Sequence, residues 1–124
     1  MNVLCVCNQG LNRSKIAAKF LERKGHTTIY KGIGDDAPNP LTKKEWDWAE
    51  AVVFAREWHR KKANERFGEK EQEFVLEVTD DLQELPELWR RAKLMNPEQF
   101  YKEYTLPRIE EKLVSIYESL EQKL

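Results

Sequence analysis

The chain has 124 residues, the length of one ordinary domain, and we expect a single domain over residues 1–124. With 40% hydrophobic and 35% charged residues, its composition excludes a collagen, a disulfide scaffold and a disordered tail. The 21 basic and 22 acidic residues nearly cancel, and no apolar run approaches the ~18 residues of a membrane span, so neither nucleic acid nor a membrane is an expected partner.

Strands and helices are predicted to alternate from the first residues onward. Residues 3–7 form an unbroken apolar run, which predicts a buried central strand. The polar segment 8–12 predicts a turn, and the apolar residues of the helix predicted over 14–24 share one face. Gly25 stands where a glycine commonly ends a helix. A second strand is predicted over 27–30 from its β-branched and aromatic residues.

A helix start signal lies in the middle of the chain. The glycine- and proline-containing segment 32–40 predicts a loop. Thr42 and Glu45 then have the spacing of a capping box, which predicts a short helix ending near Glu50. An apolar run over 51–55 predicts the third strand.

The remaining elements continue the alternation. A basic helix is predicted over 56–67, a fourth strand over 74–78 and a helix over 86–94. The last helix is predicted to run to about residue 123. Its apolar residues repeat at helical spacing: Ile109, Leu113, Ile116, Tyr117 and Leu120. Alternating strands and helices predict an α/β fold, a parallel sheet with helices on both faces.

The segment from Cys7 to Ser14, called here the Cys7–Ser14 loop, combines a nucleophile with an anion site. Backbone N–H groups of such a turn point inward, and the dipole of the following helix adds positive potential. A thiol held there is expected to have a lowered pKa and to be a thiolate. Arg13 can bind a phosphate through two parallel hydrogen bonds, and the Ser14 hydroxyl can bond the sulfur. We expect positive φ at Gly10. The residues expected to bind phosphate follow the cysteine directly: Asn8, Gln9, Gly10, Leu11, Asn12, Arg13 and Ser14.

These residues resemble the low-molecular-weight protein tyrosine phosphatases, whose loop reads C-x5-R-S close to the N-terminus. A short prokaryotic branch of that family is the closer likeness. That branch has A-x-x-P-L-T before its first downstream helix, matched by Ala37–Thr42. Trp48-Ala49-Glu50, an apolar strand and His59-Arg60 match its next segment. The likeness covers roughly residues 1–81 and implies a flavodoxin-like three-layer sandwich with a four-stranded parallel sheet in order 2-1-3-4.

The resemblance also implies roles for the site residues. Cys7 would be the nucleophile, Arg13 would bind the phosphate and stabilise the transition state, and Ser14 would stabilise the leaving thiolate. The family's general acid is an aspartate after the fourth strand, matched best by Asp80. Asp81 is its rival, because the proline that usually follows that aspartate is absent. No metal and no cofactor is implied, since Arg13 and the loop amides supply positive charge.

Three positions depart from the family pattern. Gly10 stands where the family usually has asparagine, and Tyr30 where it has a serine after the second strand. In the family these two residues support each other, so we expect a differently braced loop here. Asn12 replaces the second loop cysteine of many members, and Cys5 is no obvious substitute for it.

The expected function is hydrolysis of phosphotyrosine or an aryl phosphate through a cysteinyl-phosphate intermediate, in the cytoplasm, by a cysteine-dependent protein tyrosine phosphatase. An arsenate reductase on this fold would need cysteines after Cys7, and the chain has none. A phosphocysteine carrier has less use for Arg13, which speeds hydrolysis. A catalytically weak phosphate-binding module is a further alternative, because the loop supports and the proline after the acid are changed.

Three other features are interpreted as structural. The basic residues Arg56, His59, Arg60, Lys61 and Lys62 are interpreted as a solvated helix face, and His26 as a surface residue after the first helix. Cys5 is interpreted as part of the core.

Overall fold

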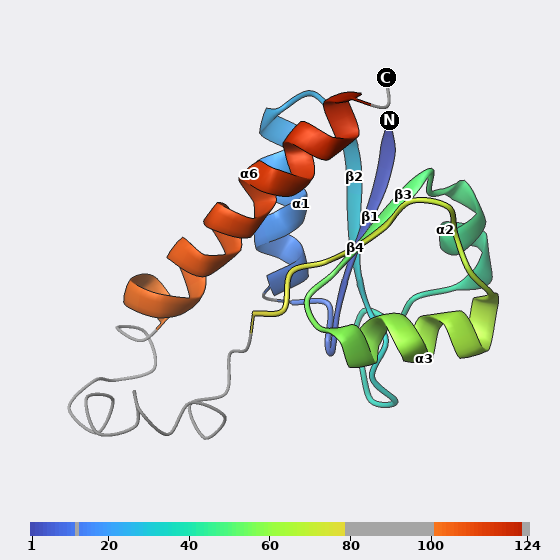
Figure 1. Cartoon of the computed structure of the whole chain (residues 1–124). Helices are drawn as coiled ribbons and strands as arrows, with labels where there is room; N and C mark the ends of the chain where they lie inside the picture. The colour runs from blue at the N-terminus through green and yellow to red at the C-terminus, as the bar shows by residue number, and fades with distance from the viewer. Residues whose placement is uncertain (12, 79–100, 123–124) are drawn as a thin grey trace, which may run out of the picture.

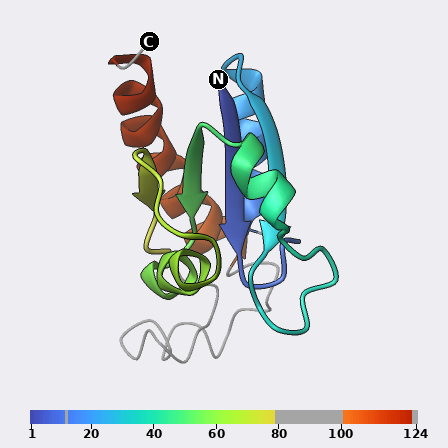
Figure 2. The same ribbon diagram turned by 90° about the vertical axis from the view of Figure 1, so that its right-hand side faces the viewer.

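The computed structural model describes residues 1–11, 13–78 and 101–122. Within this part, one parallel sheet has the strand order β2-β1-β3-β4, which confirms the predicted order 2-1-3-4. Its strands are β1 (Asn2–Cys7), β2 (Thr27–Gly32), β3 (Ala51–Phe54) and β4 (Glu73–Val75). All four arrows point toward the same edge of the sheet (Figure 2).

Helices cover both faces of this sheet, so the fold is the predicted three-layer α/β sandwich. Helix α1 (Arg13–Arg23) and helix α6 (Leu106–Gln122) lie on one face, while α2 (Lys43–Trp48) and α3 (Glu57–Phe67) lie on the other (Figure 1). A π-helical turn over Tyr101–Thr105 leads into α6. No helix of the described residues has the length and apolar character needed to cross a membrane.

Strand β1 forms the centre because its residues from Val3 to Cys7 are all buried. Val3 and Cys5 belong to the core under α1 and α6, and Leu4 and Val6 to the core under α2 and α3, as the alternation of a strand requires. The parallel register places Cys7 beside Gly32 of β2. The carboxyl end of β1 therefore meets the end of β2, the edge at which open α/β sheets bind ligands.

The predicted helix ends agree with the observed capping geometry. Thr42 and Glu45 form both hydrogen bonds of the capping box before α2. Gly25 and Gly68 follow α1 and α3 with φ of +98° and +93°. The apolar stripe of the last helix is buried at four positions, and Tyr117 packs against the same core.

Some boundaries differ from the predictions. Strand β2 extends to Gly32, and α2 ends two residues early, at Trp48. Strand β4 ends at Val75 rather than residue 78, because Glu77 has φ of +53° and turns the backbone out of a regular strand. Val78 N–H nevertheless donates to Ala55 O at 3.1 Å. The helix predicted over 86–94 lies outside the described residues.

The interpretation of His26 as a surface residue is wrong. Its side chain is only 5% exposed, and its ring stands edge-on to Tyr117 of α6 at a centroid distance of 6.3 Å. Helix α6 therefore contributes to the cover over His26, which a reading of the local sequence does not reveal.

Candidate active site

The sulfur of Cys7 lies at the centre of the loop that follows β1. Cys7 is the last residue of that strand and is 3% exposed. The backbone N–H of Gly10 donates to Cys7 Sγ at 3.2 Å. Ser14 Oγ lies 3.1 Å from the same sulfur. A backbone amide from the middle of the loop and a hydroxyl from the start of α1 thus converge on one sulfur, and such donors favour the thiolate over the thiol.

Arg13 opens α1 with a guanidinium held inside the protein. The residue is 6% exposed, and its Nη1 donates to Val78 O at 2.8 Å. This contact ties the beginning of α1 to the segment after β4, although the two are 65 residues apart in sequence. A buried cation at the end of the Cys7–Ser14 loop supplies fixed positive charge, as a site for an anion such as phosphate would require.

Backbone contact with β2 braces the loop. Gly10 has φ of +74°, as predicted, and a Cβ atom on it would lie 2.5 Å from Gly32 N. A Cβ on Gly32 would in turn lie 2.5 Å from Gln9 C. Neither position has room for a side chain, because two stretches of backbone touch there. The sequence predicted that this loop is braced differently from the family's loop. In the structure the brace is a backbone contact between Gly10 and Gly32.

Hydrogen bonds from the segment after β2 add to this brace. Ile33 N–H donates to Cys7 O at 3.0 Å, and Gly34 N–H donates to Asn8 O at 2.8 Å. The first two carbonyl groups of the loop are thereby bonded to the segment after β2. The Cys7–Ser14 loop is thus fixed both by contacts with the end of β2 and the segment after it and by the hydrogen bonds to Cys7 Sγ.

His59 is a buried residue of this region that the sequence interpretation missed. Its side chain is fully buried, so the interpretation of residues 56–62 as one solvated face is wrong for His59. Arg56 N–H donates to His59 Nδ1 at 3.0 Å, so the ring proton of the neutral imidazole belongs on Nε2. Burial, with smaller contributions from the positive charges of Arg13 and Arg56, lowers the pKa of His59 to about 3.

One sequence signal marks His59. It stands three residues after Arg56, at the third position of a helix that begins directly after β3, and thus at the carboxyl edge of the sheet. Nε2 of His59 has no hydrogen-bond partner within the described part of the chain. The positive charge of Arg13 is among the causes of the lowered pKa of His59.

The other predicted phosphate-binding residues divide into two groups. The side chains of Asn8, Gln9 and Leu11 are exposed, so these residues would contribute to an anion site mainly through their backbone. Asn12 and the two candidate acids, Asp80 and Asp81, lie outside the described residues.

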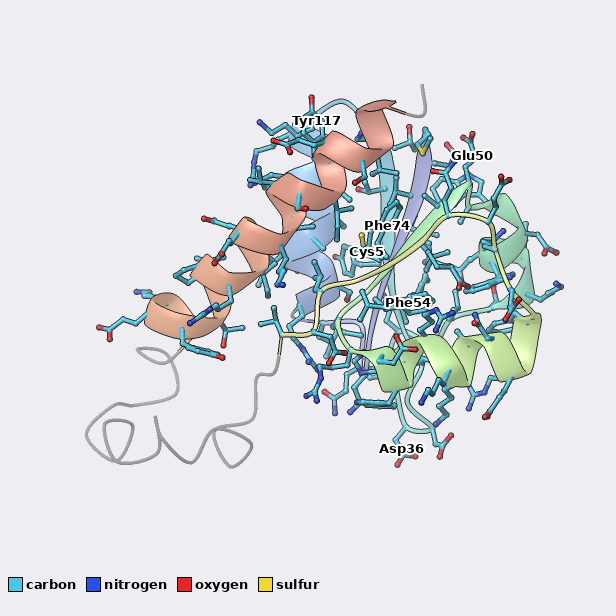
Figure 3. The ribbon with its side chains drawn as sticks, in the orientation of Figure 1. Cys5, Asp36, Glu50, Phe54, Phe74 and Tyr117 are labelled. Carbon is cyan, nitrogen blue, oxygen red and sulfur yellow. The ribbon has the colours of Figure 1, made fainter. Side chains whose placement is uncertain are left out.

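Cys5 provides a contrast to Cys7 two positions away. It is fully buried in the middle of the sheet, and burial raises the pKa of its thiol, with the neighbouring Cys7 adding to the effect (Figure 3). Neither Cys5 nor Cys7 is part of a disulfide bond. The residues described contain no group of three side chains suited to holding a metal ion.

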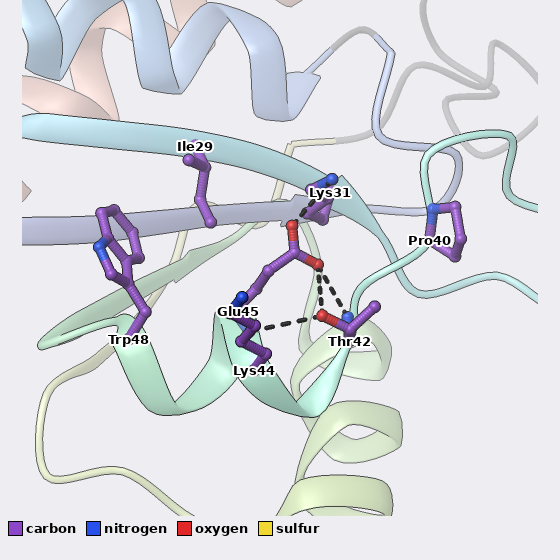
Figure 4. A pocket seen from close by; sticks show the side chains of 7 residues that line it. All are labelled: Ile29, Lys31, Pro40, Thr42, Lys44, Glu45 and Trp48. Carbon is purple, nitrogen blue, oxygen red and sulfur yellow. Dashed lines mark hydrogen bonds and ion pairs between the residues drawn. The ribbon is translucent and has the colours of Figure 1, made fainter.

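A cavity of about 620 Å³ lies elsewhere, between β2 and α2 (Figure 4). Two of its lining residues, Lys31 and Glu45, form an ion pair at 2.8 Å. Glu45 is also the acidic member of the capping box. No residue of the Cys7–Ser14 loop lines this cavity, so it is separate from the candidate site.

Comparison with known proteins identifies the fold. No family model and no curated protein matches the chain in sequence. A YwlE mutant from Bacillus subtilis has a TM-score of 0.69 and 18% identity, covering 98% of this chain and 99% of that chain. The YwlE arginine phosphatase from Geobacillus stearothermophilus has a TM-score of 0.68 and 20% identity, covering 98% and 94%.

A third solved structure carries the family name suggested by the sequence. It is the solution structure of a low molecular weight protein tyrosine phosphatase from Bacillus subtilis, with a TM-score of 0.65 and 16% identity, covering 98% of each chain. The chain therefore has the fold of the low-molecular-weight protein tyrosine phosphatases over nearly its whole length.

Proposed function

We propose that the protein is a cysteine-dependent phosphatase of the low-molecular-weight protein tyrosine phosphatase family, acting on phosphotyrosine or aryl phosphates. One observation carries the proposal: Gly10 N–H and Ser14 Oγ converge on Cys7 Sγ at 3.2 Å and 3.1 Å. A thiol that served only in packing would resemble Cys5, which is buried among apolar side chains. Donors around sulfur suit a thiolate nucleophile.

In the first step, the Cys7 thiolate attacks phosphorus in line with the leaving oxygen. The S–P bond forms while the P–O bond to the leaving group breaks, and Asp80 gives its proton to the departing oxygen. Arg13 and the loop amides bind the equatorial oxygens of the transferring group. Val78, which accepts a hydrogen bond from Arg13, precedes Asp80 by two residues and Asp81 by three, which supports an acid from this segment.

In the second step, Asp80 as carboxylate takes a proton from water, which attacks phosphorus and breaks the S–P bond. The electron pair returns to sulfur, where the Ser14 hydroxyl stabilises the thiolate. Inorganic phosphate leaves, and the enzyme regains its starting state. Arg13 and the amides supply the positive charge, so this mechanism uses no metal ion.

The exposed loop side chain favours an aryl substrate. Leu11 is 53% exposed and presents an apolar surface beside the anion site. An aromatic ring can pack on such a surface, whereas the charged guanidinium of a phosphoarginine gains little from it. Phosphoarginine is the second candidate substrate, because the solved structures of the same fold include arginine phosphatases.

Two peptides of identical sequence, one with phosphotyrosine and one with phosphoarginine, test the substrate class. We expect wild-type protein to release phosphate from the phosphotyrosine peptide with the higher kcat/KM, and Cys7→Ser to release none from either. Preference for the phosphoarginine peptide would reassign the substrate. A phosphorylated protein that accumulates without turnover would indicate a carrier, and no reaction at all would indicate a binding module.

A reducing compartment is part of the proposal. Neither Cys5 nor Cys7 is part of a disulfide bond, and a thiolate at the active site must remain reduced to act as nucleophile. We therefore propose the cytoplasm as the place of action.

A further inference from the structure

A groove of about 480 Å³ runs along the seam between α1 and α6. The two helices lie side by side on one face of the sheet (Figure 1). Apolar side chains from the loop, from α1 and from the first turn of α6 line the groove: Leu11, Ile16, Phe20 and Leu106. Because Leu11 belongs to the Cys7–Ser14 loop, the groove borders that loop. We call it the α1–α6 groove.

The rim of the α1–α6 groove is positively charged. Lys15, Lys19 and Arg23 line it and follow one another at four-residue spacing, so they form one row along α1. All three are exposed, and none forms an ion pair with a described residue. Glu110 of α6 is the one acidic residue among those that line the groove.

Cations on the opposite face of the sheet are arranged differently. Lys62 and Arg66 of α3 both contact Asp35, at 2.8 Å and 3.0 Å. Arg60 of the same helix contacts Glu73 at 3.1 Å. A chain with a net charge of -1 thus pairs Arg60, Lys62 and Arg66 of α3 within the fold and leaves only Lys61 of that helix without an ion pair to a described residue. All three cations of the row on α1, by contrast, are uncompensated by described residues. The charge pattern is complementary to an acidic ligand.

The length of the row sets the size of that ligand. Lys15 and Arg23 are eight residues apart on α1, which at about 1.5 Å per residue corresponds to roughly 12 Å along the helix axis. An extended peptide advances about 3.3 Å per residue, so roughly four residues would follow the row. The row begins next to Ser14, the last residue of the loop.

We propose that the α1–α6 groove binds an acidic flank of a phosphoprotein substrate, about four residues to one side of the phosphorylated residue. Carboxylates of the flank pair with Lys15, Lys19 and Arg23, and an apolar side chain occupies the floor near Phe20. The inference rests on the proposed phosphatase function and adds the substrate class: phosphorylated protein segments with neighbouring acidic residues.

Three substrates and two double variants test this inference. The substrates are para-nitrophenyl phosphate and two phosphotyrosine peptides that differ only in having glutamates or glutamines on both flanks. The first variant, Lys19→Gln with Arg23→Gln, removes two charges of the row and leaves the Cys7–Ser14 loop intact. The matched control, Lys44→Gln with Lys61→Gln, removes two exposed lysine charges from α2 and α3 on the other face of the sheet.

We expect wild type and control to prefer the glutamate peptide, and the row variant to lose this preference through a higher KM. The loss of two exposed ion pairs between the row and the peptide predicts a roughly three- to tenfold increase in KM. This difference in KM should become smaller when salt is added. The rate on para-nitrophenyl phosphate should stay the same in all three proteins. Equal kcat/KM for the two peptides in wild type, with para-nitrophenyl phosphate turned over, overturns the inference and leaves the phosphatase proposal standing.

A binding experiment tests the inference independently of catalytic turnover. Fluorescein-labelled, unphosphorylated versions of both peptides are titrated with wild type and the row variant, and anisotropy gives Kd. Tighter binding of the glutamate peptide by wild type alone supports the groove even if no phosphate substrate is hydrolysed. Equal binding of both peptides, or binding only to phosphatidylserine vesicles, overturns it, the latter by assigning the row to an anionic membrane surface.

Discussion

Gly10 of the Cys7–Ser14 loop and Gly32 at the end of β2 touch through their backbones. A Cβ atom on Gly10 would lie 2.5 Å from Gly32 N, closer than real contacts allow, and Gly10 also has φ of +74°. The same residue donates its N–H to Cys7 Sγ. A shift of Gly10 relative to β2 would therefore move a donor away from the proposed nucleophile.

Gly10→Ala should impair both stability and catalysis. An alanine at position 10 would have to adopt a left-handed backbone conformation, and its Cβ would overlap with the backbone of Gly32. Together these two effects predict a loss of about 2 to 4 kcal/mol in the free energy of unfolding. We expect turnover of an aryl phosphate to fall more than tenfold even in the folded fraction, because Gly10 N–H moves off the sulfur. Urea unfolding and steady-state kinetics measure the two effects.

Gly25→Ala is the matched control for that variant. Gly25 also has positive φ, +98°, but nothing lies within 4 Å of its Cβ position. We expect Gly25→Ala to lose about 1 kcal/mol of stability and to retain wild-type turnover. Equal effects of the two variants on turnover would show that the contact with Gly32 does not hold the loop.

Ser14→Ala should make the Cys7 thiol less reactive at neutral pH. The change removes the hydroxyl 3.1 Å from Cys7 Sγ, which stabilises the thiolate, so the pKa of Cys7 should rise. The rate of alkylation by iodoacetamide, measured against pH with peptide mapping, should show a higher midpoint in the variant. Cys5 is the internal control, because its burial should leave it unlabelled until the protein unfolds. An unchanged midpoint would remove Ser14 from the proposed mechanism.

His59 should make the protein less stable as the pH falls below about 6.5. Burial and two neighbouring arginines lower the pKa of His59 to about 3 in the folded state, against an ordinary value near 6.5. Between these values the unfolded chain binds a proton that the folded chain does not, so stability rises with pH by up to about 1.4 kcal/mol per unit.

Urea unfolding of wild type and His59→Gln between pH 7 and pH 5.5 measures this effect. The chosen range lies above the ordinary titration of carboxylates. We expect a clear downward slope toward acid in wild type and a flatter one in the variant. Identical slopes would mean that His59 is protonated in the folded protein.

Asp80→Asn should slow catalysis in a manner that depends on the leaving group. General acid catalysis typically contributes about 10²- to 10⁴-fold, and a good leaving group such as nitrophenolate hardly needs a proton. We expect a steep dependence of kcat on leaving-group pKa in Asp80→Asn and a wild-type dependence in Asp81→Asn. The reverse result would exchange the roles of the two aspartates, and a wild-type dependence in both would place the acid elsewhere.

The local parts of the fold and site could be predicted from the sequence. The capping box at Thr42 and Glu45 and the glycine after α1 depend on neighbouring residues, and both were predicted. The convergence of Gly10 and Ser14 on Cys7 also lies within eight consecutive residues. Features of this kind depend on residues that are close in sequence, so they can be predicted from a short segment of the chain.

Features that depend on packing between distant segments were not predictable. The contact of Gly10 with Gly32 follows from the register of β1 and β2, which pairs Cys7 with Gly32. His59 was missed because α3 buries only His59 and Ala63, too few residues for an apolar stripe to mark the inner face. The bond from Arg13 to Val78 joins segments that only the folded sheet brings together.

The most direct test of the proposed function is to find the phosphoryl group on the protein during turnover. Wild-type protein is mixed with para-nitrophenyl phosphate, quenched in acid within the first turnovers, and its peptides are mapped by mass spectrometry. We predict one phosphoryl group on the peptide that contains Cys5 and Cys7, its loss together with loss of turnover when Cys7 is changed to alanine, and its retention in Cys5→Ala. Wild-type turnover by Cys7→Ala, or a phosphoryl group carried by Cys5, would contradict the proposal.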